Sequence, residues 1–240
     1  MAFGKLYAIR GNPRTDPIIA IAKANNLDLE IIETRPGTTG PEYFKINKLG
    51  RIPTFVGSDN FVLHETIAIC IYFASQNEKT TLLGKSKQDY ATILKWMSFA
   101  NQDLVGTCPE WLYPFLFDFP YNEKKAEESF KKTLIALKAI EEALVDKMYL
   151  AGECMTIADL FTACIMRTIF QWKLDKKWRE ENPNTTRWYT NVINQPLFSD
   201  SCESFPFIDE AVQYVPPKKE SEPEAAPDKT EKQVEDSSRD

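Results

Sequence analysis

Two short segments of the chain combine residue types that suit the binding of a small peptide. The first, residues 50–56 (Gly-Arg-Ile-Pro-Thr-Phe-Val), places Pro53 at the mouth of a predicted strand. Proline donates no N–H group, and in a tight turn its peptide bond adopts the cis form at a cost of only about 0.5–1 kcal/mol. That turn leaves the amide and carbonyl of Ile52 free to pair with an extended ligand. For Pro53 alone, an ordinary edge strand that begins with proline is the alternative.

The second segment, residues 63–69 (Leu-His-Glu-Thr-Ile-Ala-Ile), runs from a strand into an apolar helix. The N–H groups of Glu65 and Thr66 then lie at a helix N-terminus, which attracts carboxylates. Thr66 adds a hydroxyl donor, and Glu65 adds an acceptor that suits an ammonium group. Together with Arg51, Ile52 and Pro53, they predict a site for a ligand end that carries both charges.

The elements that must position these residues follow in a readable order. Strands at 5–9 and 29–33 flank a helix at 16–25, and helical and loop residues then lead to Gly50. Two further strands, 54–56 and 61–63, meet at a hairpin-type turn before a helix at 65–75. A polar linker, 76–87, separates this α/β half from a second half with helical patterns at about 88–105, 123–144, 156–170 and 185–194. The pattern indicates an α/β domain followed by an all-α domain.

A capping box begins the third of these helices. Thr156 and Asp159 have the spacing at which each side chain bonds the other residue's backbone N–H, and Met155 can pack on Leu160 as a hydrophobic staple. Loss of such a cap typically costs about 1 kcal/mol. We therefore expect Thr156 and Asp159 to have a structural role.

Taken together, these motifs resemble the glutathione transferase superfamily, from about Lys5 to Tyr214. The resemblance implies a thioredoxin-like N-terminal domain at 1–78 and an all-helical glutathione transferase C-terminal domain at 86–214. It also implies that Pro53 is cis, that Ile52 pairs with the cysteinyl part of glutathione, and that Glu65 and Thr66 hold its γ-glutamyl end.

Catalysis by such a protein requires a donor that holds the glutathione thiol as thiolate. Transferases carry Tyr, Ser or Cys after the first strand for this purpose. Here the serine position holds Asn12, a weak substitute, while Arg14 offers charge and Thr15 a hydroxyl. These three are the candidate thiol-contacting residues, and no residue is assigned a confident catalytic role.

Composition bounds the remaining possibilities. A net charge of −6 and a pI near 5.1 argue against a general nucleic-acid surface, and no apolar stretch is long enough to span a bilayer. The basic stretch 173–179 fits a solvated helix end better than a docking patch. Five cysteines without a CxxC pair, and a single histidine, predict neither a zinc site nor a dithiol centre. We expect a soluble, cytoplasmic protein without a metal or a resident cofactor, glutathione being a ligand.

Residues 215–240 differ in composition from the rest. After Val215 the segment carries eight acidic and five basic residues and no aromatic one, which predicts a disordered charged tail or linker. This tail, with the pattern WR..NP...RW...V over residues 178–192, resembles the gamma subunits of the eukaryotic translation elongation factor 1 complex. In that family a linker leads to a C-terminal domain, which is absent here. Both a truncated product and a form that keeps only the transferase-like module fit the sequence.

The two resemblances support two functions. The first is a non-catalytic scaffold that binds the nucleotide-exchange subunit of elongation factor 1, and through it the GTPase, with a retained glutathione-type pocket. The alternative is an active glutathione transferase that conjugates glutathione to electrophiles. The aromatic segment 111–121, broken by prolines, fits a partner-binding surface, and it fits equally a lid over the ligand cleft or the contact of a homodimer.

Overall fold

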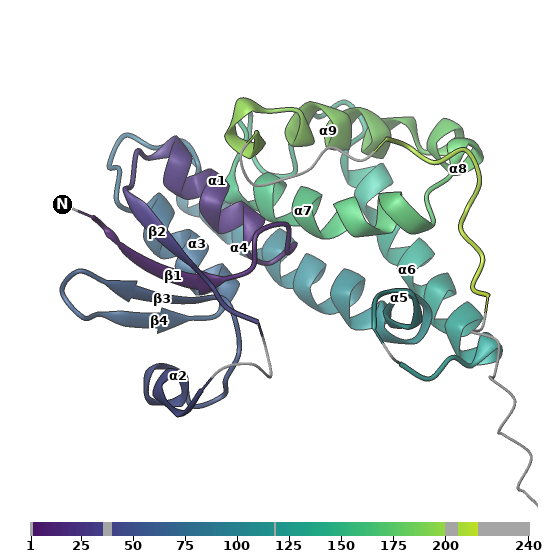
Figure 1. Cartoon of the computed structure of the whole chain (residues 1–240). Coiled ribbons are helices and arrows are strands. Elements are labelled where there is room, and N and C mark those ends of the chain that lie inside the picture. Colours follow the sequence, from purple (N-terminus) through teal and green to yellow (C-terminus); the bar gives the residue numbers. More distant parts are fainter. Residues whose placement is uncertain (1, 36–39, 118, 200–205, 216–240) are drawn as a thin grey trace, which may run out of the picture.

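The computed structural model describes residues 2–35, 40–117, 119–199 and 206–215. A sheet domain at the N-terminal end lies beside a larger helical domain (Figure 1). This is the predicted order of an α/β thioredoxin-like domain and an all-helical domain. The expected tail, apart from Val215, lies outside the described residues.

The sheet has four strands in the order β2-β1-β3-β4, and each is close to its predicted range. The strands are β1 (Gly4–Ala8), β2 (Leu29–Glu33), β3 (Thr54–Gly57) and β4 (Val62–His64). Strand β1 pairs parallel with β2 and antiparallel with β3, which pairs antiparallel with β4. A parallel neighbour requires a crossover, and α1 (Asp16–Ala24) supplies it.

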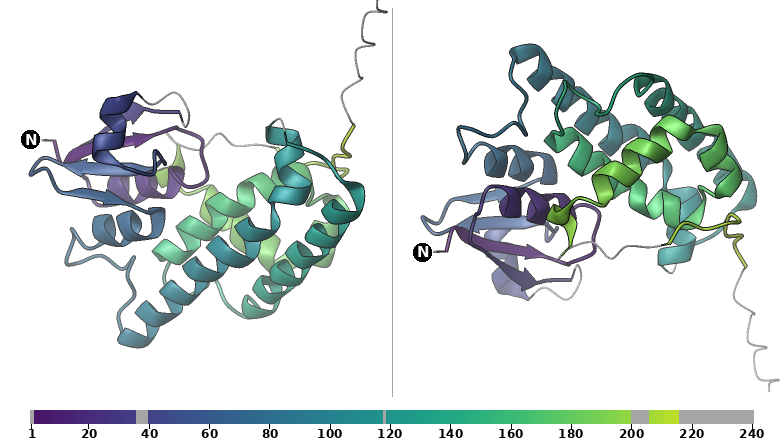
Figure 2. Two further views of the ribbon diagram at one scale, coloured as in Figure 1. Left: turned by 90° about the horizontal axis from the view of Figure 1, so that it is seen from below. Right: turned by 90° about the horizontal axis from the view of Figure 1, so that it is seen from above.

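Helices cover both faces of this sheet. Helices α1 and α3 (Thr66–Ala74) pack together on one face, and the short α2 (Pro41–Ile46) lies on the other side (Figure 2). The apolar side chains between the sheet and the helix pair, such as Leu6, Ile18, Phe55 and Phe73, are fully buried. The carboxyl end of β1 and the start of β3 are thereby held next to the N-terminus of α3.

The helical domain is built around α7. Its elements are α4 (Lys87–Phe99), a π-helical turn η1 (Ala100–Leu104), a 3₁₀ turn η2 (Val105–Thr107), α5 (Pro109–Leu116), α6 (Glu123–Ala143), α7 (Ile157–Trp172), α8 (Lys176–Glu181), α9 (Pro183–Ile193) and a 3₁₀ turn η3 (Pro196–Phe198). Nearly every residue of α7 is buried, because α4 and α9 pack on it and α1 packs on it across the domain boundary. Helix α7 therefore joins the two domains.

The segment 111–121 is more regular than its prolines suggest. Its first part belongs to α5, which begins at Pro109, where a missing N–H costs nothing, and continues through Pro114. The buried side chains of Trp111 and Leu112 anchor this short helix to the core. Tertiary packing thus outweighs the local cost of Pro114.

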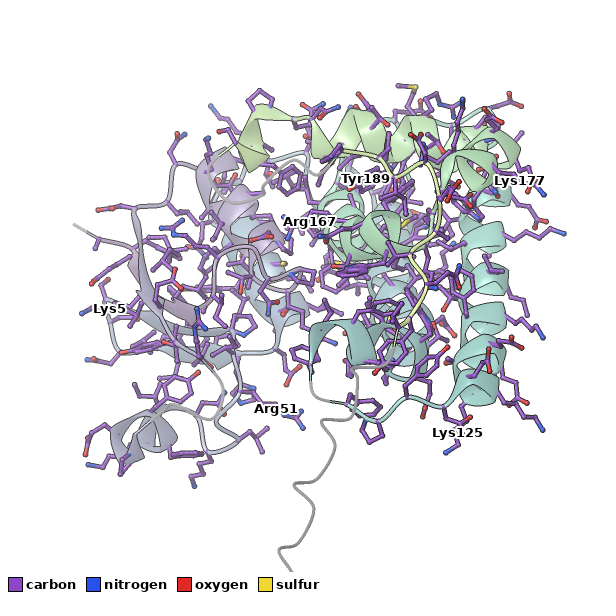
Figure 3. The ribbon with its side chains drawn as sticks, turned by 45° about the vertical axis from the view of Figure 1, so that its right-hand side comes forward. Lys5, Arg51, Lys125, Arg167, Lys177 and Tyr189 are labelled. Carbon is purple, nitrogen blue, oxygen red and sulfur yellow. The ribbon has the colours of Figure 1, made fainter. Side chains whose placement is uncertain are left out.

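Residues 206–215 form an irregular segment, here called the strap, that crosses the helical domain. It is fastened through its backbone: Arg179 Nη1 donates to the Ile208 carbonyl at 2.6 Å, Lys173 Nζ donates to the Val212 carbonyl at 2.8 Å, and the Val212 N–H donates to the Trp172 carbonyl at 2.9 Å. Phe207 packs near Tyr189, which Figure 3 labels beside the strap. The sequence placed residues 206–214 in the all-helical domain, but this segment contains no helix.

Candidate functional site

A cavity of about 320 Å³ lies where the predicted motifs meet. All five predicted binding residues line it, together with the thiol candidate Arg14. The lining residues are Arg14, Asn47, Leu49, Gly50, Arg51, Ile52, Pro53, His64, Glu65 and Thr66. The fold therefore brings the proline turn, the N-terminus of α3 and the loop after β1 to one place.

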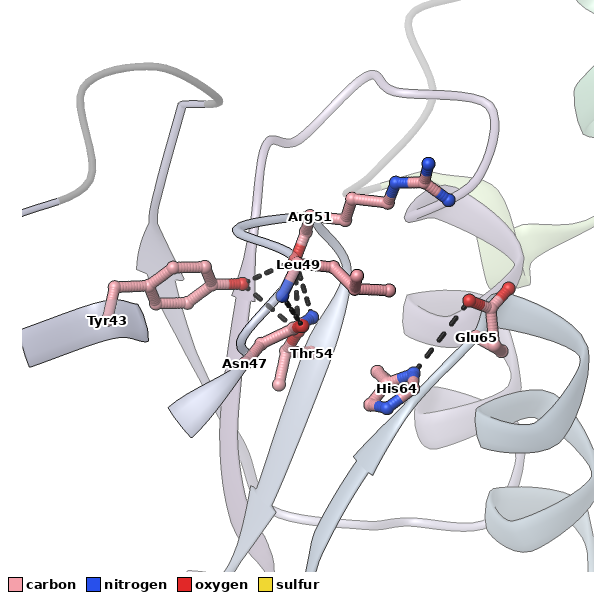
Figure 4. A network of polar contacts seen from close by, with 7 residues as sticks. All are labelled: Tyr43, Asn47, Leu49, Arg51, Thr54, His64 and Glu65. Carbon is pink, nitrogen blue, oxygen red and sulfur yellow. Dashed lines mark hydrogen bonds and ion pairs between the residues drawn. The ribbon is translucent and has the colours of Figure 1, made fainter. Parts of the chain in front are cut away.

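The proline turn is held by a polar network that sequence reasoning missed. The Ile52–Pro53 peptide bond is cis. The Arg51 carbonyl accepts hydrogen bonds from the Tyr43 hydroxyl at 2.6 Å, Asn47 Nδ2 at 3.0 Å and the Thr54 hydroxyl at 3.1 Å (Figure 4). Burial raises the pKa of Tyr43, so its hydroxyl stays protonated and able to donate. These side chains fix the backbone of Arg51 directly before Ile52.

The N-terminus of α3 is open toward the cavity. Glu65 precedes the helix with a φ of 74°, a backbone conformation that residues other than glycine rarely adopt. Its side chain is 63% exposed, makes no capping hydrogen bond, and lies 3.8 Å from His64 Nδ1. Strained residues persist where the surrounding structure enforces them, often at ligand sites. The first N–H groups of α3 have no capping side chain, so a ligand carboxylate can bind there.

The three thiol candidates, all in the loop after β1, have different surroundings. Arg14 lines the cavity. Asn12 does not: its Oδ1 accepts the Arg14 N–H at 2.8 Å and so shapes the loop. Thr15 is fully buried and is also absent from the lining. Of the three candidates, Arg14 is the one that lines this cavity.

The predicted capping box is present at the start of α7. The fully buried Asp159 carboxylate accepts hydrogen bonds from the Thr156 N–H and hydroxyl at 2.8 and 2.9 Å, from the Leu150 N–H at 2.8 Å, and from Trp188 Nε1 at 2.9 Å. Burial raises the pKa of Asp159, and these hydrogen bonds act in the opposite direction. Trp188, noted in the sequence only as part of a family pattern, completes the network from α9.

The aromatic segment divides into a buried and an exposed part. Trp111 is only 2% exposed, and its Nε1 donates to the Thr133 hydroxyl at 3.0 Å. Trp111 is thus a core residue and cannot belong to a partner surface. The exposed aromatic residues of the segment are Phe117, Phe119 and Tyr121, of which Phe117 is 62% exposed.

Other kinds of site find no support in the described part of the chain. It contains no group of three or more His, Cys, Asp or Glu side chains that could hold a metal ion. Cys70, Cys108 and Cys164 are buried, and burial raises the pKa of Cys108 to about 12, which disfavours its thiolate. None of the described helices has the length and apolar character needed to cross a membrane.

Comparison with known proteins agrees with this geometry. Residues 2–75 match the model for the glutathione S-transferase N-terminal domain, and residues 70–196 match that for the C-terminal domain. Glutathione S-transferase psoE of Aspergillus fumigatus is 44% identical over 211 residues, which cover 88% of each chain. Elongation factor 1-gamma of Schizosaccharomyces pombe is 29% identical over 94% of this chain but only 55% of its own length.

The solved structures show the same two resemblances. The transferase-like domain of elongation factor 1-gamma from Saccharomyces cerevisiae superposes with a TM-score of 0.78, at 28% identity, over 91% of this chain and all of that domain. The identity expected from the tail, an elongation factor gamma subunit, is not confirmed, because relatives named as transferases are more similar in sequence. The relatives named as transferases and the elongation factor domain both match this chain over its sheet domain and its helical domain. The chain belongs to the glutathione S-transferase family.

Proposed function

We propose that the chain is a glutathione transferase that adds the glutathione thiol to an electrophilic carbon. The observation that carries this proposal is the cavity in which the cis-proline turn, the open start of α3 and Arg14 meet. The cysteinyl backbone pairs with Ile52, the γ-glutamyl carboxylate lies at the Thr66 N–H and hydroxyl, and Glu65 faces the ammonium. Arg14 and Arg51 supply positive charge for the remaining carboxylate and for the thiolate.

The reaction needs the thiolate, because the thiol of a free cysteine has a pKa of about 8.5 and is a poor nucleophile when protonated. The sulfur attacks the electrophile, a C–S bond forms, and a leaving group departs with its electron pair. Arg14 favours the thiolate through its charge, without the hydroxyl or thiol donor that transferases carry after the first strand. A hydrogen bond to a charged group contributes about 1.5–3 kcal/mol, so we expect turnover well below the order of 10 per second.

Calorimetry and an activity assay test this proposal together. Titration with millimolar glutathione should release heat in the parent, and Glu65→Ala should weaken binding by tenfold or more. The matched control is Glu42→Ala, which removes an exposed carboxylate of α2 that pairs with Lys45 and does not line the cavity. Arg14→Ala should lower conjugation of a simple aromatic electrophile more than it lowers affinity. Absence of heat in the parent would contradict the proposal.

A second candidate is the scaffold of the elongation factor 1 complex. It is supported by the TM-score of 0.78 to the yeast gamma-subunit domain and by the exposed Phe117 and Phe119 beyond α5. In this proposal the chain is cytoplasmic and binds the nucleotide-exchange subunit, and through it the GTPase. The exposed apolar side chains of Leu116, Phe117, Phe119 and Tyr121 suit such a contact, and they suit self-association equally.

Light scattering distinguishes these possibilities. The full chain and a version that ends at Val215 are mixed with the nucleotide-exchange subunit, and the mass of the complex is followed. Phe117→Ser with Phe119→Ser should abolish the complex, whereas Trp111→Ala is unsuitable because it would disrupt the core. Binding by the full chain alone would assign the contact to residues after 215. A mass of two copies without the partner would assign the surface to a homodimer.

A further inference from the structure

The loop that carries Arg14 into the cavity is held by a residue of the other domain. Gly11, within this loop, has a φ of +77°. Its N–H donates to Asp16 Oδ1 at 2.9 Å, and its carbonyl accepts a hydrogen bond from Arg167 Nη2. Both backbone groups of Gly11 are thus bound to an ion pair between α1 and α7. Figure 3 shows Arg167 at the boundary between the two domains.

This ion pair is buried and close. Arg167 Nη2 lies 2.8 Å from Asp16 Oδ2, and the two side chains are 5% and 0% exposed. Burying two charges costs desolvation energy that their attraction often fails to recover, so apolar replacements of such pairs are commonly neutral or stabilising. Stability alone therefore gives little reason for a charged pair here. Asp16 and Arg167 each make one hydrogen bond to the backbone of Gly11, which indicates that the ion pair determines the conformation of the loop.

The position of Arg167 is itself well fixed. It lies eight residues after Asp159, on the same helix, whose start is tied to Leu150, Thr156 and Trp188. Because an α-helix rises about 1.5 Å per residue along a regular axis, fixing its start at Asp159 also fixes where Arg167 lies. Through Arg167 the helical domain thereby determines where the loop of the sheet domain lies. Within the loop, Asn12 Oδ1 accepts the N–H of Arg14 and so fixes the backbone of Arg14 relative to Gly11.

We propose that Arg167 is a positioning residue for the cavity: through Asp16 and Gly11 it fixes the loop that places Arg14 beside a bound thiol. The functional part of this inference rests on the proposed glutathione binding. The structural part does not, because it concerns only the order of the loop. Two measurements therefore keep the inference and the proposed function separate.

The variant that tests both parts is the double substitution Asp16→Leu with Arg167→Met, which removes both charges and leaves neither partner unpaired. Arg167→Lys is the second variant, since it keeps a charge against Asp16 and loses the planar guanidinium. The matched control is Arg179→Met. It removes another arginine that binds backbone carbonyls, those of Leu174 and Ile208, in the part of the helical domain near α8.

The first measurement is amide hydrogen exchange of residues 9–16 without ligand. We expect exchange at least tenfold faster in the double variant, a smaller increase in Arg167→Lys, and no change in Arg179→Met. Unchanged exchange in both test variants overturns the inference. This outcome does not depend on glutathione.

The second measurement is the absorbance of the bound thiolate near 240 nm across pH, at saturating glutathione. Because Ile52, Glu65 and Thr66 are untouched, the double variant should bind glutathione within about threefold of the parent. The pKa of the bound thiol should rise by about one unit, a tenfold loss of thiolate at a given pH. A thiol pKa equal to that of the parent overturns the positioning role. If the parent binds no glutathione, the proposed function fails, and hydrogen exchange still decides whether Arg167 orders the loop.

Discussion

Two apolar helices of this molecule begin beside an acidic residue and a threonine, and their beginnings are opposite in character. At α7 the Asp159 carboxylate is fully buried and accepts four hydrogen bonds from the surrounding protein. At α3 the Glu65 side chain is mostly exposed, its backbone is strained, and no side chain caps the helix. The first start is satisfied within the protein, whereas the second presents its donors to a cavity.

The difference shows how one set of residue types serves stability in one place and binding in another. A helix N-terminus always leaves N–H groups without intrahelical partners. Where the protein supplies the acceptor, the result is a rigid joint. Where it does not, the result is a site for an anion. The four predictions below test this distinction, from the largest expected effect to the smallest.

Asp159→Ala should lower the free energy of unfolding by about 3–5 kcal/mol. The substitution leaves the Thr156 and Leu150 amides and the Trp188 indole without an acceptor in the core, and each buried unsatisfied donor costs about 1–3 kcal/mol. Urea denaturation measures the change. A loss below about 1 kcal/mol would show that the network adds little to the packing around it.

Trp188→Phe should cost less, about 2 kcal/mol, because it removes one of the four donors and part of a buried ring. The same urea denaturation series measures it, with the m-value as a check that the denatured state is unchanged. If Trp188→Phe and Asp159→Ala lower the free energy of unfolding equally, most of the stabilisation by Asp159 comes from the indole hydrogen bond and not from the helix cap.

Glu65→Gly should weaken glutathione binding without lowering the stability of the fold. Glycine adopts a φ of 74° without strain, so we expect a stability equal to that of the parent or up to about 1 kcal/mol higher. Glutathione affinity should fall by tenfold or more, since the acceptor for the ammonium is lost. Thermal unfolding and calorimetry on the same sample measure both quantities. A destabilised variant would show that Glu65 has a structural role like that of Asp159.

Glu141→Gln should have the smallest effect and depend on pH. From α6, the Glu141 carboxylate accepts the Asn184 and Thr185 N–H groups at the start of α9, at 3.1 and 2.7 Å. Burial opposes ionisation, but these hydrogen bonds outweigh it and lower the pKa of Glu141. The carboxylate then stabilises the fold above the ordinary glutamate pKa of about 4.3, and this contribution disappears as the pH falls through the lower, folded value.

Denaturation at pH 6 and pH 3 measures that dependence. At pH 6 the parent should exceed Glu141→Gln in stability by about 1 kcal/mol, the usual contribution of a cap. At pH 3 the difference should shrink. A difference that grows toward acid would reverse the assigned direction of the pKa shift.

The features that could be predicted from sequence are those that residues close in the chain determine. Pro53 and the pair Thr156 and Asp159 follow from the local chemistry of turns and caps, and the strands follow from apolar alternation. The start of α3 was found for the same reason, although the strain at Glu65 was not. The family match confirms the fold that these signals indicated.

The features that were missed depend on residues that meet only in the folded chain. Arg167 reaches Gly11 across 156 positions, and no local pattern marks either residue. Thr15 was a reasonable candidate by type and position, but it is fully buried in the folded chain. The network of Tyr43, Asn47 and Thr54 combines a short helix, a loop and a strand, so it has no periodicity to detect.

The hydrogen bonds that hold the strap have a consequence for which residues can vary between relatives. Besides the ring contacts of Phe207 and Tyr214, its hydrogen bonds are made by its own carbonyl and amide groups, to the side chains of Lys173 and Arg179 and to the end of α7. Every amino acid offers the same carbonyl, so the residues at 208 and 212 can change during evolution while the path of the chain is preserved. The two cations, by contrast, cannot be replaced by apolar residues without the loss of these hydrogen bonds. The record of natural variation should therefore be permissive at positions 208 and 212 and strict at Lys173 and Arg179.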